Sequence, residues 1–449
     1  MRTSSWSLEQ SSASAELKRF VSEKLAQVRA EPRAAGHEMA SEFKALFAAA
    51  ERGDWRMVSN SLKEVQNGMQ QDKTDSSKAR VVYPIEWSAA LEIAGAFEQF
   101  AAGDENYAAA FGRDIIASIP PGSIYFGGTD AGRCLVTALS KSHVNGDPFF
   151  TLTQNALADR RSYLRYARSM YGNRIYIPTE QDATSAYDHY LEDAQRRLKE
   201  NKLRPGEDLG QVDGKMQVRG AISVMAINGA LSQLMFDKNP NREFYLEESF
   251  PLEWTCPHLE PHGLILKINR QPLPQLSGEV VRRDHEYWTR YIRPMIGDWL
   301  NYDMPLTETV AFVEKIYLKH DLSGFGGDPR YVQNDMPQKN FGKLRSSIGG
   351  VYVWRAQNAK STGAKERMVK EADFAFRQAF ALSPGNPEVV FRYVSLLLAE
   401  KRLDEAILVA ETGQKVETET PVKPETRGPN LIRSQLGALV EQLKNMKKN

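Results

Sequence analysis

The spacing of apolar residues in the first quarter of the chain predicts helices. Residues 1–118 carry several apolar stripes at intervals of three or four, the first of them through Leu17, Phe20 and Val21. Such spacing puts apolar side chains on one face of a helix. We therefore expect a module of helical hairpins, with the polar, aperiodic stretch of about 66–80 as a mobile linker. The simplest interpretation is a structural module that contributes packing and has no catalytic or binding site.

The centre of the chain has another pattern, in which short apolar runs alternate with helix-length segments. The runs are residues 123–126, 149–152, 174–177, 216–219, 243–246 and 264–268. Short β-rich runs between helices are typical of a largely parallel sheet covered on both faces. The predicted fold class is therefore α/β, with a mostly parallel, doubly wound, Rossmann-like sheet over residues 119–301. We interpret the run 216–219 as half of a small hairpin. Residues 302–347 are predicted to be a helical bridge and a loop.

The last hundred residues, 348–449, predict a pair of tetratricopeptide-type helical hairpins and a capping helix. Small residues recur at helical intervals, first at Ala375 and Ala379 and then at Ala406 and Ala410. The interval is close to the period of about 34 residues that is usual for this repeat. Two units are few for a free-standing superhelix, so we expect them to pack on the α/β domain. A concave peptide-binding face and a C-terminal brace both remain open.

Composition and charge limit the kinds of partner that the protein could bind and the cellular compartment in which we expect it. The 449 residues predict two or three domains, and a net charge of +1 gives no basic field for nucleic acid or an anionic membrane surface. The most apolar helix-length window, residues 221–236, is too short to span a bilayer. Cys134 and Cys256 are the only cysteines, which fits a reducing compartment. We expect a soluble, cytoplasmic protein; an exported or tethered form stays open if an upstream segment is missing.

One glycine-rich turn predicts a ligand pocket. The run 123–126 ends in Gly127, Gly128, Thr129 and Asp130, and a helical pattern follows. Glycines let backbone N–H groups approach an anion, and the new helix directs its positive end toward it. With Arg133 one turn into that helix, the turn predicts a pocket for an anionic small molecule. It matches neither the dinucleotide-binding fingerprint nor a phosphate-binding loop, so it does not identify the ligand.

Polar residues also follow the other predicted strands. The carboxyl ends of parallel strands share one edge of a sheet, where α/β proteins bind ligands. The alternative is that Asp130 and Asn155 only cap helices. The predicted ligand-binding residues are Gly127, Gly128, Thr129, Asp130, Arg133, Gln154, Asn155, Glu247 and His262.

Cys256, His258 and His262 are a close group of soft metal ligands. Structural zinc needs four ligands, and Pro257 and Pro261 predict an irregular loop. We therefore predict no metal site and no cofactor, with His262 at the end of a loop.

No catalytic residue can be assigned from the sequence. Neither a Ser-His-Asp order nor a nucleophile elbow is present. Asp130 with Glu247 or Glu248 would permit acid–base chemistry on a sugar or phosphate ester without indicating it. Whether the chain is an enzyme therefore remains open.

Several segments resemble one poorly characterised bacterial family of tetratricopeptide-repeat proteins. They are residues 119–130, 153–159, 226–229, 244–249, 259–267 and 341–349. The α/β part of this family resembles the soluble C-terminal portion of polytopic, glycosyltransferase-like membrane proteins. The first interpretation of the function is an interaction or scaffold protein whose repeats bind a protein or peptide partner, with room for a small-ligand pocket in the α/β domain. The alternative is a glycosyltransferase-related enzyme that binds an activated sugar or nucleotide at the glycine-rich rim.

Overall fold

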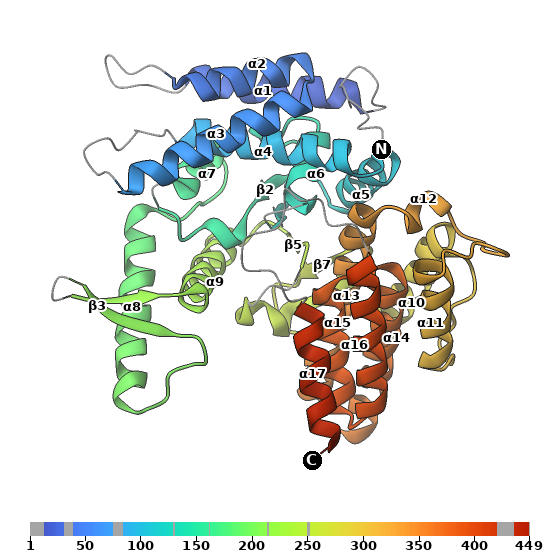
Figure 1. Ribbon diagram of the computed structural model, residues 1–449. Helices are drawn as coiled ribbons and strands as arrows, with labels where there is room; N and C mark the ends of the chain where they lie inside the picture. Colours follow the sequence, from blue (N-terminus) through green and yellow to red (C-terminus); the bar gives the residue numbers. More distant parts are fainter. Residues whose placement is uncertain are drawn as a thin grey trace. The chain divides into compact units, whose positions relative to one another are not determined.

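The chain forms a mixed α/β fold in which helices far outnumber strands. The computed structural model describes residues 13–30, 39–74, 84–128, 131–160, 162–212, 215–248, 252–419 and 435–448. Two compact units divide the chain, Met1–Thr255 and Cys256–Asn449. Figure 1 shows the elements of both units.

The first unit begins with five helices, as the apolar stripes predict. They are α1 (Ser14–Ala30), α2 (Ser41–Arg52), α3 (Trp55–Thr74), α4 (Pro84–Ala102) and α5 (Glu105–Ser118). In α1 the predicted stripe through Leu17, Phe20 and Val21 is buried. Helix α3 continues to Thr74, so the first part of the predicted linker is helical. The rest of that linker, residues 75–80, lies outside the described residues.

Helix α6 (Ala131–Leu139) lies in the core of the first unit, and every one of its residues is buried. Glycines let α4 and α5 pack closely on it. A Cβ on Gly95 of α4 would lie 2.3 Å from the Sγ of Cys134, and one on Gly112 of α5 would lie 2.7 Å from Leu139 Cδ1. The N-terminal helices therefore share one core with the first β–α segment.

Three short parallel strands form the sheet of the first unit: β1 (Ile124–Phe126), β2 (Phe150–Leu152) and β5 (Phe244–Leu246). Strand β1 lies in the middle, with Tyr125 opposite Thr151 on one side and Tyr245 on the other. All three strands are buried throughout, which explains their continuous apolar sequences.

The strand predicted at residues 174–177 does not form. The backbone N–H of Tyr176 donates to Asn239 Oδ1 at 2.8 Å, and its carbonyl accepts from Asn239 Nδ2 at 3.0 Å. An asparagine side chain thus takes the place of a neighbouring strand.

Helices and one hairpin connect β2 to β5. They are η4 (Gln154–Ala156), α7 (Tyr163–Tyr171), α8 (Glu180–Lys199), β3 (Asp208–Val212), β4 (Lys215–Arg219) and α9 (Ala221–Lys238), and η3 (His143–Asn145) precedes β2. Strands β3 and β4 pair antiparallel, which confirms the predicted small hairpin. It lies against α8 and α9 (Figure 1).

The second unit begins with an antiparallel hairpin of β6 (Leu259–His262) and β7 (Ile265–Ile268), after the 3-10 helix η5 (Glu253–His258) that spans the boundary. Strand β7 was predicted, whereas the residues of β6 were predicted as an irregular loop because of Pro257 and Pro261. Proline cannot donate to a ladder but is tolerated in a strand at a sheet edge. Among the described strands β6 pairs with β7 alone.

The rest of the second unit is helical. Its elements are α10 (Gly278–Ile296), α11 (Leu306–Val313), the π-helical turn η6 (Glu314–Leu318), α12 (Pro329–Val332), α13 (Asp335–Gln357), α14 (Thr362–Leu382), α15 (Pro387–Ala399), α16 (Leu403–Glu419) and α17 (Gln435–Lys448). Each helix from α13 to α17 packs on the next, and Figure 1 shows them side by side. The four small residues predicted at crossings, Ala375, Ala379, Ala406 and Ala410, are fully buried. Helix α13 begins at Asp335, ahead of the predicted start at 348.

A buried ion pair joins three helices of the second unit. The guanidinium of Arg345 in α13 donates to Asp284 Oδ2 in α10 at 2.9 Å and to Gln378 Oε1 in α14 at 2.7 Å. The Tyr352 hydroxyl donates to the same Asp284 oxygen at 2.7 Å. Because buried charges need partners, this network fixes how the three helices face one another.

No helix in the described part of the chain combines the length and the apolar character needed to cross a bilayer.

Candidate functional site

The glycine-rich turn after β1 packs closely against the protein itself. A Cβ on Gly127 would lie 2.9 Å from Tyr125 Cε1 and 3.1 Å from the carbonyl oxygen of Gly132. Gly128 has a φ of +70°, and its N–H donates to Gln154 Oε1 at 3.0 Å. Both glycines therefore serve close approaches within the first unit. Thr129 and Asp130, also predicted as site residues, lie outside the described residues.

The segment after β2 places buried polar atoms at the same edge. Asn228 of α9 fixes this segment, because its Nδ2 donates to the Asn155 carbonyl and its Oδ1 accepts from the Ala158 N–H, each at 2.7 Å. Three buried side-chain atoms here have no hydrogen-bond partner in the described part of the chain. They are Thr153 Oγ1, Gln154 Nε2 and Asn155 Oδ1. The predicted convergence of the β1 and β2 ends is thus present, as the Gly128–Gln154 hydrogen bond shows.

The residue after β5 also reaches this edge. The Glu247 N–H donates to the Phe126 carbonyl at 2.9 Å. The side chain lies against the first turn of α6, since a Cβ on Gly132 would be 2.0 Å from Glu247 Cδ. A carboxylate is favourable near a helix N-terminus. The position predicted for an anionic ligand is therefore next to a carboxylate of the protein.

Arg133 occupies a different place from the one predicted. Its guanidinium is buried and donates to Glu92 Oε1 through Nη2 at 2.7 Å and through Nε at 3.1 Å. Helix α6 is buried all round, so a charged side chain on it needs a partner inside the core. The charge predicted to meet a ligand is balanced by Glu92 instead.

Glu92 is the centre of a buried network that the sequence did not reveal. Its Oε2 lies 2.6 Å from Lys24 Nζ, accepts from the Tyr166 hydroxyl at 2.6 Å and lies 3.5 Å from His143 Nε2. One signal was present in the sequence, because Lys24 falls on the apolar stripe of α1 between Val21 and Val28. A charge on a buried stripe indicates a partner elsewhere in the chain.

Burial and the neighbouring charges determine the protonation states of Glu92 and His143 in this network. Burial alone would raise the pKa of the Glu92 carboxyl, but the charges of Lys24 and Arg133 outweigh burial and hold that pKa well below its usual range. Burial lowers the pKa of His143 to about 4, and the charge on Lys24 acts in the same direction. The His143 ring therefore stays neutral at pH 7, while the Tyr171 hydroxyl contacts its Nδ1 at 3.0 Å. The members of this cluster pair with one another, so we interpret it as structural.

His262 is the last residue of β6 in the second unit and is partly buried. In the same region the Nδ1 of His258 contacts the Asn269 carbonyl at 2.7 Å. Within the described ranges, no group of three or more His, Cys, Asp or Glu side chains has the arrangement of a metal site.

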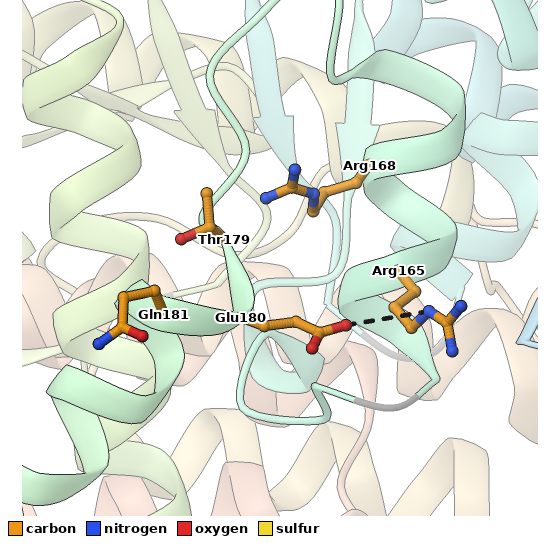
Figure 2. A pocket seen from close by; sticks show the side chains of 5 residues that line it. All are labelled: Arg165, Arg168, Thr179, Glu180 and Gln181. Carbon is orange, nitrogen blue, oxygen red and sulfur yellow. Dashed lines mark ion pairs between the residues drawn. The ribbon is translucent and has the colours of Figure 1, made fainter.

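A surface pocket of roughly 430 Å³ lies between α7 and the start of α8. Figure 2 shows Arg165 directed toward Glu180, and the two side chains lie 4.0 Å apart. Arg168 donates to the Pro178 carbonyl at 3.4 Å. The first turn of α8 is closed by a capping box of Thr179 and Asp182. Because these groups already have partners, the pocket is a weaker candidate than the edge of the sheet.

Comparisons with protein-family models, curated proteins and solved structures find no match to this chain.

Proposed function

We propose that the first unit binds a small, hydroxyl-rich ligand of the sugar class at the carboxyl edge of β2, β1 and β5. The observation that carries this proposal is the group of buried polar atoms on Thr153, Gln154 and Asn155 that have no partner in the described part of the chain. A buried polar group without a hydrogen bond costs about 1–3 kcal/mol. A ligand that donates and accepts hydrogen bonds would remove that cost.

A neutral ligand fits this edge better than an anion. Two features were predicted to attract an anion, and each lies beside a carboxylate of the protein. Arg133 pairs with Glu92, and the first turn of α6 lies against Glu247. Hydroxyl groups can donate to a carboxylate and to the Asn155 amide oxygen and can accept from Gln154 Nε2. We infer that a sugar ring, not the phosphate of an activated sugar, contacts these residues.

The topology supports the same location. Strand β1 lies between β2, which follows it through α6, and β5, which joins from the other side. In doubly wound sheets, ligands bind where the strand order reverses, outside the carboxyl ends of the strands. We propose that the first unit is a reduced form of this doubly wound plan.

Ligand binding is tested by thermal unfolding of the full chain with glucose, N-acetylglucosamine and inorganic phosphate. We expect at least one sugar to raise the melting temperature through mass action and phosphate to leave it unchanged. Asn155→Ala removes the amide side chain but keeps the backbone carbonyl that Asn228 holds. This variant should weaken sugar binding about three- to tenfold, the value of one hydrogen bond.

Asn145→Ala is the matched control, because Asn145 lies in η3 before the amino end of β2 and is exposed. It should bind the sugar like the parent protein. Equal stabilisation by phosphate, or unchanged sugar affinity in Asn155→Ala, would rule the proposal out.

The enzyme alternative would use the same edge. Glu247 and Glu248 are consecutive buried carboxylates after β5, and a carboxylate beside the ring can act as general acid or base in the transfer of an activated sugar. If the chain has such activity, Glu248→Gln should abolish turnover of a nucleotide sugar while the protein still binds the free sugar.

We also propose that α13–α17 form a tetratricopeptide-type array that binds a segment of a partner protein. Successive packing of these helices, small residues at their crossings and an apolar side chain on the surface support this role; Phe391 of α15 is 38% exposed. The test is a photo-crosslinking residue at position 391, with exposed Lys365 of α14 as the control position. Crosslinks to one protein at 391 and none at 365 are expected. No crosslink, or equal crosslinks at both positions, would contradict this role.

A further inference from the structure

The second unit contains a cavity of about 250 Å³ beside an acid–base pair. It is formed by the first half of α10 and by α14. Its lining includes the side chains of Arg282, His285, Glu286, Arg367 and Glu371. All of them belong to the second unit, whereas the ends of β1, β2 and β5 belong to the first.

His285 is held in a fixed orientation at this cavity. Its ring stacks on Phe374 with centroids 4.7 Å apart and lies 4.9 Å from the ring of Tyr302. Its Nδ1 is 3.8 Å from Glu371 Oε2, while Glu371 Oε1 accepts from the Tyr302 hydroxyl at 2.9 Å. A carboxylate next to Nδ1 favours the proton on that nitrogen, which leaves Nε2 of the neutral ring as an acceptor.

Two of the cationic side chains in the region of His285 already have carboxylate partners. Arg282 forms ion pairs with Glu279 at 2.8 Å and with Glu286 at 2.7 Å. Lys370 pairs with Asp303 at 2.9 Å.

Arg367 is exposed and has neither a hydrogen bond nor an ion pair with any residue that the structure describes. Its Nη2 lies beside the start of α10, 3.6 Å from where a Cβ on Gly278 would be. A guanidinium is therefore available where the cavity is lined by Gly278.

We propose that this cavity binds a small hydroxycarboxylate. The carboxylate would pair with Arg367, because a guanidinium matches two carboxylate oxygens. The hydroxyl would donate to His285 Nε2, which Glu371 and the two aromatic rings hold in place. The volume is below the range of about 300–1,000 Å³ that is usual for drug-sized ligands, which suits a molecule of this size.

The test compares related small molecules by calorimetry on the full chain. L-Malate carries carboxylates and a hydroxyl, succinate lacks the hydroxyl, and glycerol lacks the carboxylates. We expect L-malate to bind about three- to tenfold more tightly than succinate, the effect of one hydrogen bond. Glycerol should not bind measurably. Equal affinity for L-malate and succinate, or no binding of either, would overturn the proposal.

Variants assign the two contacts. His285→Phe keeps the ring stacking but loses both nitrogens, so it should bind L-malate and succinate equally. Arg367→Met keeps the aliphatic stem but loses the charge, so it should weaken both ligands more than tenfold. Arg283→Met, which removes an exposed arginine of α10 outside the cavity lining, is the matched control and should bind like the parent. Unchanged binding in His285→Phe or Arg367→Met, with an unchanged melting temperature, would contradict the assignment.

Discussion

At the scale of single residues, the stability of the first unit depends on one buried carboxylate that balances the positive charges around it. Glu92 is 2% exposed, and Lys24, Arg133 and His143 all approach its two oxygens. When one partner of a buried ion pair is removed, the remaining charges stay buried without a counter-charge. This lowers the stability of the fold more than the removal of an exposed surface charge does. The strongest single-residue effects on stability are therefore expected here.

Glu92→Gln should lower the free energy of unfolding by about 3–5 kcal/mol, because two buried cations would lose their counter-charge. Urea unfolding at pH 7 measures this loss. The matched control is Glu98→Gln, an exposed position on the same helix, which should change stability by less than about 0.5 kcal/mol. Similar values for the two variants would show that the Glu92 network does not form.

His143 makes stability depend on pH. Its folded-state pKa is lowered to about 4, below the unfolded value of about 6.5. Between these values the unfolded chain binds a proton that the folded chain does not, so stability falls as pH drops from about 6.5 to 4. The expected contribution is roughly 3 kcal/mol.

Urea unfolding at pH 7 and pH 5 gives the size of this dependence. It should be smaller in His143→Gln than in the parent, whereas exposed His189→Gln should leave it unchanged. A pH dependence identical in all three proteins would show that His143 titrates normally.

At the scale of elements, helix contacts rely on residues without large side chains. Gly132 in α6 admits the Glu247 side chain, and Gly95 and Gly112 let α4 and α5 reach the same helix. In the second unit, a Cβ on Gly342 of α13 would lie 2.5 Å from Ser383 Cβ and 3.5 Å from the carbonyl oxygen of Ala379, which is fully buried in α14. A Cβ at any of these four glycines would require a neighbouring side chain to move.

Gly132→Ala should destabilise the first unit by about 1–3 kcal/mol, because the new Cβ would overlap the Glu247 carboxyl group. Gly350→Ala is the control, since Gly350 is also helical but has open space around it. There the substitution should be neutral or stabilising by about 0.5–1 kcal/mol. Denaturant unfolding compares the two, and a neutral Gly132→Ala would mean that Glu247 lies elsewhere.

Ala379→Leu should overpack the crossing of α13 and α14 and cost about 1–3 kcal/mol. Ala399→Leu, at the exposed end of α15, should have little effect. The melting temperatures of both variants give the comparison. An unchanged value for Ala379→Leu would remove the support for the tight helix array.

At the scale of the whole molecule, stability should not depend on metal. Within the described ranges no cluster of His, Cys, Asp or Glu has the form of a metal site, and structural zinc would contribute directly to folding. We expect EDTA to leave the circular dichroism signal and melting temperature unchanged and Cys256→Ser to be mild. Stoichiometric zinc that is lost together with structure on chelation would contradict this expectation.

The sequence predicted those parts of the molecule that local pattern determines. The stripe of α1 and the buried alanines of α14 and α16 follow from helical periodicity. The convergence of Gly128 and Gln154 follows from the rule that parallel strands share one edge. The partner of Arg133 could not be predicted in this way, because Glu92 lies 41 residues earlier. The same applies to residues 174–177, whose backbone partner Asn239 lies 63 residues after Tyr176.

The position of Lys24 has a consequence for the order in which the protein folds during synthesis. Helix α1 leaves the ribosome before α7, yet its buried amine contacts Tyr166, which is made 142 residues later. Its ion-pair partner Glu92 is made earlier, in α4, but the pocket around the amine is complete only when α7 has been made, so α1 cannot complete its packing before then. The helices α13–α17 each contact the next in sequence, and such local contacts form quickly. We therefore expect α1 to finish packing only after residues far downstream have been made, whereas α13–α17 fold almost as soon as they are made.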